Sequence, residues 1–279
     1  MSATGSRQPL LEARGLAKSY VQRRAFTGEK FHVRAFGDLN LSADPGTTLA
    51  IVGESGAGKS SLARCLALLE PPDLGEILMD GVNASGLSGS ALAAIRRKVQ
   101  LIFQDPATAL SPRFSALEIV SEPLLIEGKT KRAECRERAI ELIRQVGLTE
   151  DSARKPSLEF SGGQRQRLAI ARALALEPKL LILDEALSSL DLANQRMILG
   201  LLAGLQARLP LTYIHVSHDL RLVARMADEV AVMLDGRIVE QNRTTEIFAN
   251  PQHVYTKKLL EAMPPLEKIL AKRLHEEVA

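Results

Sequence analysis

One eight-residue segment constrains this chain more than any other feature. Gly53-Glu-Ser-Gly-Ala-Gly58-Lys59-Ser60 fits the pattern G-x-x-x-x-G-K-[ST] without deviation. A strand-like run, Leu49-Ala-Ile-Val, precedes it, and apolar residues at helical spacing follow it. Glycines let the backbone N–H groups of such a loop point inward onto a polyphosphate. The sequence therefore predicts a phosphate-binding loop between a strand and a helix.

Each part of the predicted loop has an expected role. Lys59 is expected to reach the β- and γ-phosphates of a nucleotide, and the Ser60 hydroxyl to ligate Mg²⁺. The helix that opens near Gly58 adds the positive end of its dipole. The predicted nucleotide contacts here are Gly53, Glu54, Ser55, Gly56, Ala57, Gly58, Lys59, Ser60 and Ser61.

An apolar run, Leu180 to Leu183, ends in two acidic residues, as expected for a buried strand that carries acids to its end. We expect Asp184 to hold the Mg²⁺ through water, together with Ser60. Glu185 is placed to orient or deprotonate the attacking water. The alternative is that the two acids only mark the end of a strand, but the presence of a phosphate-binding loop at residues 53–60 makes this interpretation much weaker.

Polar residues end two further predicted strands. His218 follows the run Tyr213–Val216, where it can contact the γ-phosphate; a buried structural histidine is the alternative, and we favour that alternative for His215. Gln104 follows Val99–Phe103 and can supply a carbonyl oxygen to Mg²⁺ or to water. The predicted catalytic residues are thus Glu185, His218 and Gln104, and the predicted metal ligands are Ser60, Gln104 and Asp184.

A second glycine pair opens a predicted helix in Ser161-Gly162-Gly163-Gln164, which indicates a second anion-binding helix terminus; a simple loop closure is the alternative. Two such anion-binding sites in a chain with one phosphate loop suggest that the second site serves a neighbouring molecule.

The composition disfavours a nucleic-acid partner, because the 36 Lys and Arg residues are interspersed with the 33 Asp and Glu residues and Trp is absent. No stretch approaches 18 uninterrupted apolar residues, so we expect no membrane span within this sequence.

Near the start of the chain, Leu10–Tyr20 and Leu39–Val52 are predicted to hold two strands with a long loop between them. Residues 131–146 and the segment after Gly163 are predicted amphipathic helices, and they belong to a helical insertion of about residues 110–175. Val230–Val239 is a predicted hairpin.

Together these motifs make the chain resemble the nucleotide-binding subunits of ATP-binding cassette (ABC) transporters. The resemblance is nearly full length and in the family's order: Walker A at 53–60, the Q-loop at Gln104, the signature at 161–164, Walker B at 180–185, the D-loop at 188–191 and the switch histidine at His218. It implies an α/β fold with a P-loop NTPase core, a mainly parallel sheet, an N-terminal antiparallel β subdomain and an inserted helical signature subdomain.

The resemblance also implies partners. ATP would lie between the Walker A of one subunit and Ser161, Gly162, Gly163 and Gln164 of another, in a head-to-tail dimer with a second homologous ATPase or with a second copy. Tyr20 matches the aromatic that stacks on adenine, with Phe26 or Phe31 as competitors. The dimer would drive ABC permease subunits from the cytoplasmic face of the inner membrane, as a peripheral protein, and would act indirectly on a solute-binding protein. Residues 105–125 are expected to dock the membrane subunit.

Within ABC proteins, the chain is most similar to the peptide/nickel importer ATPases. The segments that carry this similarity are Leu101–Pro106, Glu159–Arg167 and the tail Asn250-Pro-Gln-His-Val-Tyr-Thr. Val254 departs from the tail's usual Pro, and Ala186-Leu187 from the usual Pro-Thr. The resemblance implies uptake of peptides, with nickel or another solute as the alternative and a non-transport ABC-type NTPase as a weaker one. The implied domains are a nucleotide-binding domain at 1–245, with its helical subdomain at about 108–176, and a tail at 246–279.

Overall fold

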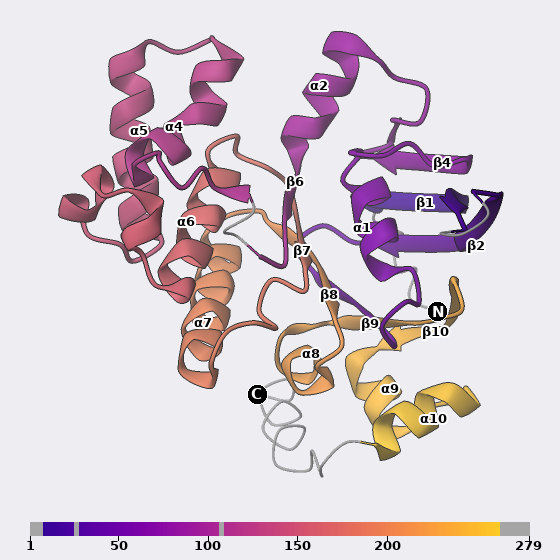
Figure 1. Ribbon diagram of the computed structural model, residues 1–279. Helices are drawn as coiled ribbons and strands as arrows, with labels where there is room; N and C mark the ends of the chain where they lie inside the picture. Colours follow the sequence, from indigo (N-terminus) through magenta and orange to yellow (C-terminus); the bar gives the residue numbers. More distant parts are fainter. Residues whose placement is uncertain (1–7, 25–27, 106–108, 263–279) are drawn as a thin grey trace, which may run out of the picture. The chain divides into compact units, whose positions relative to one another are not determined.

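The computed structural model describes residues 8–24, 28–105 and 109–262 (Figure 1). The chain divides into two compact units, residues 1–95 with 212–279, and residues 96–211. We call them the first and the second unit. Phe26, one competitor for adenine stacking, lies outside the described residues, as does the end of the predicted tail from residue 263.

The first unit holds an antiparallel sheet, which confirms the N-terminal antiparallel subdomain. Its strands lie in the order β2-β1-β4-β5, and each neighbouring pair is antiparallel. Their bounds are β1 Leu11–Arg23, β2 Lys30–Ala43, β4 Leu74–Met79 and β5 Val82–Asn83.

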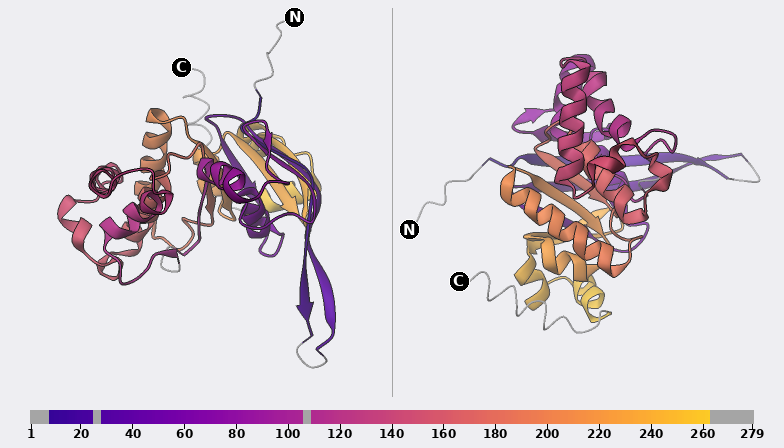
Figure 2. Two further views of the ribbon diagram at one scale, coloured as in Figure 1. Left: turned by 90° about the horizontal axis from the view of Figure 1, so that it is seen from above. Right: turned by 90° about the vertical axis from the view of Figure 1, so that its left-hand side faces the viewer.

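The prediction of a long loop after residue 20 is wrong, because β1 and β2 continue as a paired ribbon. Tyr20 pairs with Val33, and Gln22 with Phe31. Figure 2 shows the two strands running on together beyond the rest of their sheet. The β2 side of the ribbon alternates polar and apolar residues from Lys30 to Ala35, a strand signal that the loop prediction overlooked, whereas Tyr20–Arg23 on β1 shows no such alternation. The predicted strand Leu39–Val52 is likewise two strands, broken at a turn where Gly46 has φ 77°.

A second group of strands in the first unit lies in the order β10-β9-β3-β8. Strand β3 is parallel to both of its neighbours, and β9 and β10 form the predicted hairpin. Every residue of β3 and β8 is buried, which explains the continuous apolar run Leu49–Val52 of β3. Strand β8 also buries three polar residues, Thr212, His215 and Ser217. The bounds are β3 Thr48–Val52, β8 Thr212–Ser217, β9 Glu229–Leu234 and β10 Arg237–Arg243.

Helix α1, Lys59–Leu66, follows the predicted phosphate loop and buries Leu62, Cys65 and Leu66. Cys65 therefore belongs to the core, and burial raises the pKa of its thiol to about 11. The other helices among the described residues of this unit are α2 Gly89–Lys98, whose last three residues belong to the second unit, α8 Leu220–Met226, α9 Thr244–Ala249 and α10 Val254–Glu261.

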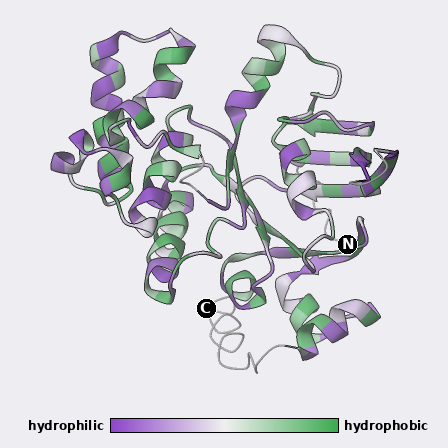
Figure 3. Cartoon of the chain, in the orientation of Figure 1, coloured by the Kyte–Doolittle hydropathy of each residue, from purple (hydrophilic) through white to green (hydrophobic). Residues whose placement is uncertain are grey.

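The second unit combines two parallel strands with helices. Strands β6 and β7 pair in parallel, and all of β7 is buried. Helices α4, α5 and α6 pack against one another. As the sequence predicts, α5 is amphipathic, with Ala139 and Ile143 buried and many hydrophilic positions (Figure 3). The elements are β6 Val99–Ile102, α4 Ala116–Glu127, α5 Arg132–Gln145, the 3₁₀ turns Glu150–Arg154 and Ser157–Glu159, α6 Gly162–Leu174, β7 Leu180–Asp184 and α7 Leu192–Arg208.

Candidate nucleotide-binding site

Two glycines of the phosphate loop are required by close backbone contacts. Gly53 has φ 151°, and a Cβ there would lie 2.1 Å from the Met233 carbonyl oxygen. Gly58 has φ 99°, and its Cβ would lie 2.2 Å from the Ala35 carbonyl oxygen. An L side chain at either position would be strained and would collide with backbone. Strands β2 and β9 therefore fix the shape of the loop from outside.

Lys59 lies inside this loop. Its side chain is buried, with 4% exposed, and its Nζ donates hydrogen bonds of 2.8 Å to the carbonyl oxygens of Gly53 and Glu54. The Glu54 carbonyl also accepts the Ala57 N–H at 3.2 Å. A buried ammonium held by carbonyl oxygens keeps its charge at the centre of the loop, where it can compensate an incoming anion.

The N-terminus of α1 is suited to an anion. Within its first turn, which the structure describes in full, there is no acidic residue, and Gly58 makes no side-chain cap. The first N–H groups of a helix have no intrahelical partner, and they carry the positive end of the dipole. An anion in the loop can satisfy both.

Strand pairing brings His218 to the same sheet edge as the loop. Val52 pairs with Ser217 across the parallel strands β3 and β8, so Gly53 and His218 follow at corresponding positions. His218 is exposed, whereas His215 is 1% exposed. Burial lowers the pKa of His215 to about 4, which keeps its imidazole neutral. The structural interpretation of His215 is confirmed.

Tyr20 lies on β1, and its hydroxyl is anchored beside α1. It donates a 2.6 Å hydrogen bond to a Glu70 carboxylate oxygen, and the Lys18 ammonium lies 5.7 Å from the ring centre. Arg64, on α1, also contacts the hydroxyl. The hydroxyl is therefore fixed, while the ring is only half-buried. The competitor Phe31 lies out on the ribbon and is 38% exposed.

In the second unit, Gln104 and Asp184 follow neighbouring parallel strands. Ile102 pairs with Leu183, so Asp184 ends β7 at the edge where Gln104 follows β6. Asp184 is 6% exposed, and Glu185 is half-buried with φ 48°. That left-handed conformation is strained for a glutamate, and the turn holds it because Ser188 donates its N–H and its hydroxyl to the Glu185 carbonyl, at 3.1 and 2.8 Å.

The N-terminus of α6 carries the Ser161–Gln164 segment. Ser161 caps the helix: the Gln164 N–H donates to its Oγ at 3.3 Å, and the Ser161 N–H donates to Gln164 Oε1 at 2.9 Å. These reciprocal bonds form a capping box and fix the first turn. Ser161 and Gly162 are exposed, so this helix end can also meet an anion.

Gly163, at this helix end, packs closely against Asn194 of α7. A Cβ at Gly163 would lie 2.2 Å from Asn194 Oδ1 and 3.2 Å from Asn194 Cβ. Asn194 in turn donates a 2.7 Å hydrogen bond from Nδ2 to Asp191, which also caps α7 through the Asn194 and Ala193 N–H groups. The sequence motifs at 161–164 and 188–191 are therefore in direct packing contact through Asn194, a residue that the sequence analysis did not single out.

Replacing Gly163 by alanine should lower the free energy of unfolding by about 1–3 kcal/mol, because the new methyl group overpacks against Asn194 and displaces its bond to Asp191. Gly162→Ala is the matched control, since the nearest atom to its Cβ is 3.8 Å away. It should change stability by less than about 0.5 kcal/mol. Denaturant unfolding without nucleotide measures both, and equal effects would contradict the packing account.

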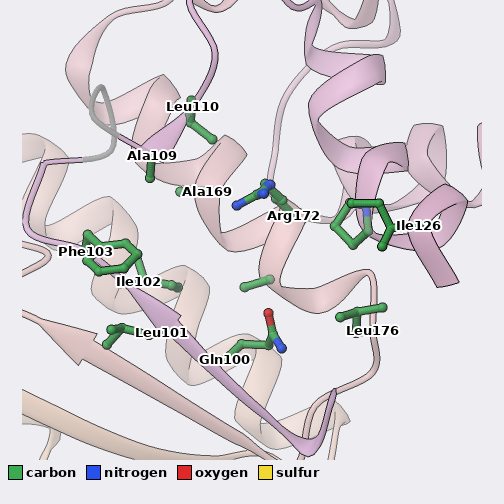
Figure 4. A pocket seen from close by; sticks show the side chains of 12 residues that line it. Gln100, Leu101, Ile102, Phe103, Ala109, Leu110, Ile126, Ala169, Arg172 and Leu176 are labelled. Carbon is green, nitrogen blue, oxygen red and sulfur yellow. The ribbon is translucent and has the colours of Figure 1, made fainter. Parts of the chain in front are cut away.

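A groove lies in the second unit, with a volume of about 240 Å³ (Figure 4). Strand β6 and helices α4 and α6 form its walls, mostly with apolar side chains. Arg172 is the charged residue of its lining and forms a 2.8 Å ion pair with Glu122. Ile126 is 78% exposed and Phe103, next to Gln104, is 38% exposed. Such an exposed apolar surface is typical of a protein interface.

The predicted site residues are distributed over both units. The first unit holds Tyr20, the loop residues Gly53 to Ser61, and His218; the second holds Gln104, Ser161 to Gln164, Asp184 and Glu185. Within each unit, parallel strand ends bring residues distant in sequence to one edge, as in other α/β ligand sites.

Residues 36–188, more than half of the chain, match the sequence profile of the family described as ABC transporter. The chain belongs to the ABC transporter family. As an ABC transporter ATPase, it hydrolyses ATP. A second family, described as the oligopeptide/dipeptide transporter C-terminal region, matches residues 239–278.

Curated relatives agree with both matches. The ABC ATPase is 42% identical to the dipeptide transport ATP-binding protein DppF of Haemophilus influenzae, over 92% of this chain and 79% of that protein. It is 43% identical to DppF of Escherichia coli, over 93% of this chain and 78% of that protein.

Solved structures confirm the fold. The ATP-binding cassette MJ0796, a dimer in a post-hydrolysis state with ADP and Pi, is 30% identical with a TM-score of 0.74, covering 84% of this chain and 98% of that one. The protein cbiO1 of Clostridium perfringens, part of an ABC transporter complex, is 29% identical with a TM-score of 0.75, covering 94% and 99%. In the part of the ABC ATPase that the structure describes, none of the helices has the length and apolar character of a membrane span.

Proposed function

We propose that this ABC ATPase energises the import of peptides through separate membrane subunits. The observation that carries the proposal is the match of residues 239–278 to the C-terminal region of oligopeptide and dipeptide transporters. The two DppF proteins, which are dipeptide transport ATP-binding proteins, support it with 42% and 43% identity.

ATP binds, in this proposal, with its phosphates in the loop from Gly53 to Ser60. The inward position of Lys59 and the first turn of α1, which has no acidic residue, support this placement. The adenine stacks on Tyr20, whose hydroxyl is already anchored by Glu70.

Mg²⁺ accompanies the nucleotide, held by the Ser60 hydroxyl, the Gln104 carbonyl and the Asp184 carboxylate. These are oxygen donors, the class that Mg²⁺ prefers, and Asp184 ends the buried strand β7 with 6% of its surface exposed. When bound, the ion neutralises charge on the transferring phosphoryl group.

Hydrolysis needs a base for water and a sensor of the γ-phosphate. We assign the base to Glu185, whose side chain is only half-buried and whose backbone is held rigidly by Ser188. His218 contacts the γ-phosphate and Gln104 orients the water. Each lies within two residues of the end of a strand, which limits the movement of its backbone.

The Ser161–Gln164 helix end is proposed to close on the ATP of a second subunit in a head-to-tail dimer, either with a homologous ATPase or with a second copy. The dimeric state of the MJ0796 cassette supports this assembly. ATP binding then closes the dimer and hydrolysis reopens it, which moves the membrane subunits.

The groove of the second unit is proposed to receive the ABC permease subunit, since its apolar walls adjoin the segment predicted to dock there. Binding at the groove would hold the ATPase at the cytoplasmic face of the inner membrane as a peripheral protein. A solute-binding protein then acts on the far side through the permease.

Deletion of the gene that encodes this ATPase should abolish uptake of a radiolabelled dipeptide by cells that otherwise take it up, because the permease then lacks its source of energy. Wild-type protein expressed in the same cells should restore uptake. Full dipeptide uptake without the gene, with loss of nickel uptake instead, would overturn the peptide assignment.

A groove variant extends the same uptake assay. Ile126→Glu places a charge in the apolar wall and should reduce uptake at least about tenfold while purified protein still binds ATP. Met197→Glu is the control, because Met197 is also exposed, at 51%, but lies on α7 outside the groove. Equal uptake by both variants would exclude the groove as the docking site.

A further inference from the structure

The tail of the chain makes a direct hydrogen bond to the phosphate loop. The Glu54 N–H donates to the hydroxyl oxygen of Tyr255 at 3.1 Å. Glu54 is the second residue of the loop, and Tyr255 is the second residue of α10, so this contact joins segments 201 residues apart. Both residues belong to the first unit.

Tyr255 is held in place by a cluster of bonds at the start of α10. Glu240 on β10 accepts the N–H groups of Gln252 and His253 at 2.8 and 3.0 Å. His253 caps α10 by accepting the Tyr255 N–H at Nδ1, at 3.2 Å. Partial burial acts to raise the pKa of Glu240, but these N–H groups stabilise the carboxylate and the pKa is lowered. Glu240 therefore stays ionised and keeps the tail attached to β10.

The ring of Tyr255 adds packing to these polar contacts. It lies, with Leu259 and Leu260 of the same helix, against a buried apolar cluster that includes Ala50 and Val52 of β3. Strand β3 leads directly into the loop. The same side chain thus packs against the cluster to which this strand contributes and, through its hydroxyl, contacts the loop itself.

Glu54 is held from both sides of its backbone. Its carbonyl accepts Lys59 Nζ, and its N–H is bound by Tyr255. Only the bond at the carbonyl involves Lys59, the residue expected to contact the phosphates. The bond to Tyr255 then keeps the first half of the loop in its shape, because it does not depend on Lys59.

We propose that Tyr255 is a positioning residue that holds the phosphate loop in its nucleotide-binding conformation. The inference rests on the proposed role of residues 53–60 in binding ATP, but it is independent of the solute carried. If the loop adopts other conformations for part of the time, its affinity for ATP falls in proportion to the fraction of molecules whose loop is in the binding conformation. The tail that marks this chain as a peptide-type ATPase is thereby also part of its nucleotide site.

Tyr255→Phe tests the proposal, because it removes only the hydroxyl. We expect the Kd for ATP of the full chain to rise about two- to tenfold, the range for one lost hydrogen bond. The turnover rate at saturating ATP should change less than twofold, and the melting temperature should fall by no more than about 2 °C. Val254→Ala, at a 64% exposed neighbouring position of α10, should leave the Kd unchanged.

Hydrogen exchange at the Glu54 amide separates positioning from a merely structural role. In Tyr255→Phe this amide should exchange faster, while amides of β3 keep their wild-type protection. An unchanged Kd together with unchanged exchange at Glu54 would overturn the inference. If instead Lys59→Ala binds ATP as tightly as wild type, the proposed site itself fails, and the two failures are thus distinguishable.

Discussion

Replacing Lys59 by alanine should weaken ATP binding at least about a hundredfold, equivalent to about 2.7 kcal/mol. Lys59 is 4% exposed, and its ammonium lies against the Gly53 and Glu54 carbonyls inside the loop. Removing it leaves those carbonyls facing the phosphates with no cation between them. Isothermal titration of the purified chain with ATP measures the loss.

Lys131→Ala is the matched control for this substitution. Lys131 is exposed and lies in the second unit, where it precedes α5. The substitution removes the same charge and should leave the affinity for ATP within about twofold of wild type, because the interactions of an exposed charge are screened by salt. Equal losses in both variants would mean that net charge, and not the loop, attracts the nucleotide.

Glu185→Gln should reduce ATP turnover by about 10²- to 10⁴-fold while leaving ATP affinity within about twofold. The amide keeps the size of the side chain and cannot accept a proton from water. The variant should therefore stall with ATP bound, as a closed dimer. Phosphate release measures the loss of turnover, and equilibrium ATP binding measures the unchanged affinity.

Glu177→Gln is the control for Glu185→Gln, because it removes the same charge from a residue with the same left-handed backbone conformation. Glu177 is in the same unit and, like Glu185, has a left-handed conformation, with φ 50°. Its ion pair with Arg138 is at the surface, with its own side chain 76% exposed, so its loss should have little effect. Turnover near wild type in Glu185→Gln would remove Glu185 from the role of base.

Sequence patterns predicted the parts of the fold whose signals are local. The continuous apolar runs Leu49–Val52 and Leu180–Leu183, and the mainly apolar run Tyr213–Val216, are buried parallel strands in the structure, since burial on both faces removes alternation. The loop at 53–60 follows the first of these strands, as its motif requires. Strand register then places Gln104 and Asp184 at one edge, which the sequence alone could only suggest.

Contacts between distant segments could not be predicted in this way. In the ribbon, the described residues 20–23 and 30–34 are mostly exposed, and Tyr20–Arg23 lacks a period-two pattern. The packing of Gly163 on Asn194 depends on how α6 meets α7. The bond from Glu54 to Tyr255 depends on how the tail returns to the loop. Each of these is set by tertiary structure, for which short motifs hold no signal.

The most direct test of the account is ATP turnover by the chain purified together with its membrane subunits and a solute-binding protein. Phosphate release should be stimulated when the solute-binding protein is loaded with a dipeptide, and Glu185→Gln should abolish both basal and stimulated release. Turnover that ignores the dipeptide would contradict the proposed peptide import. Stimulated turnover that persists in Glu185→Gln would contradict the proposed mechanism of hydrolysis.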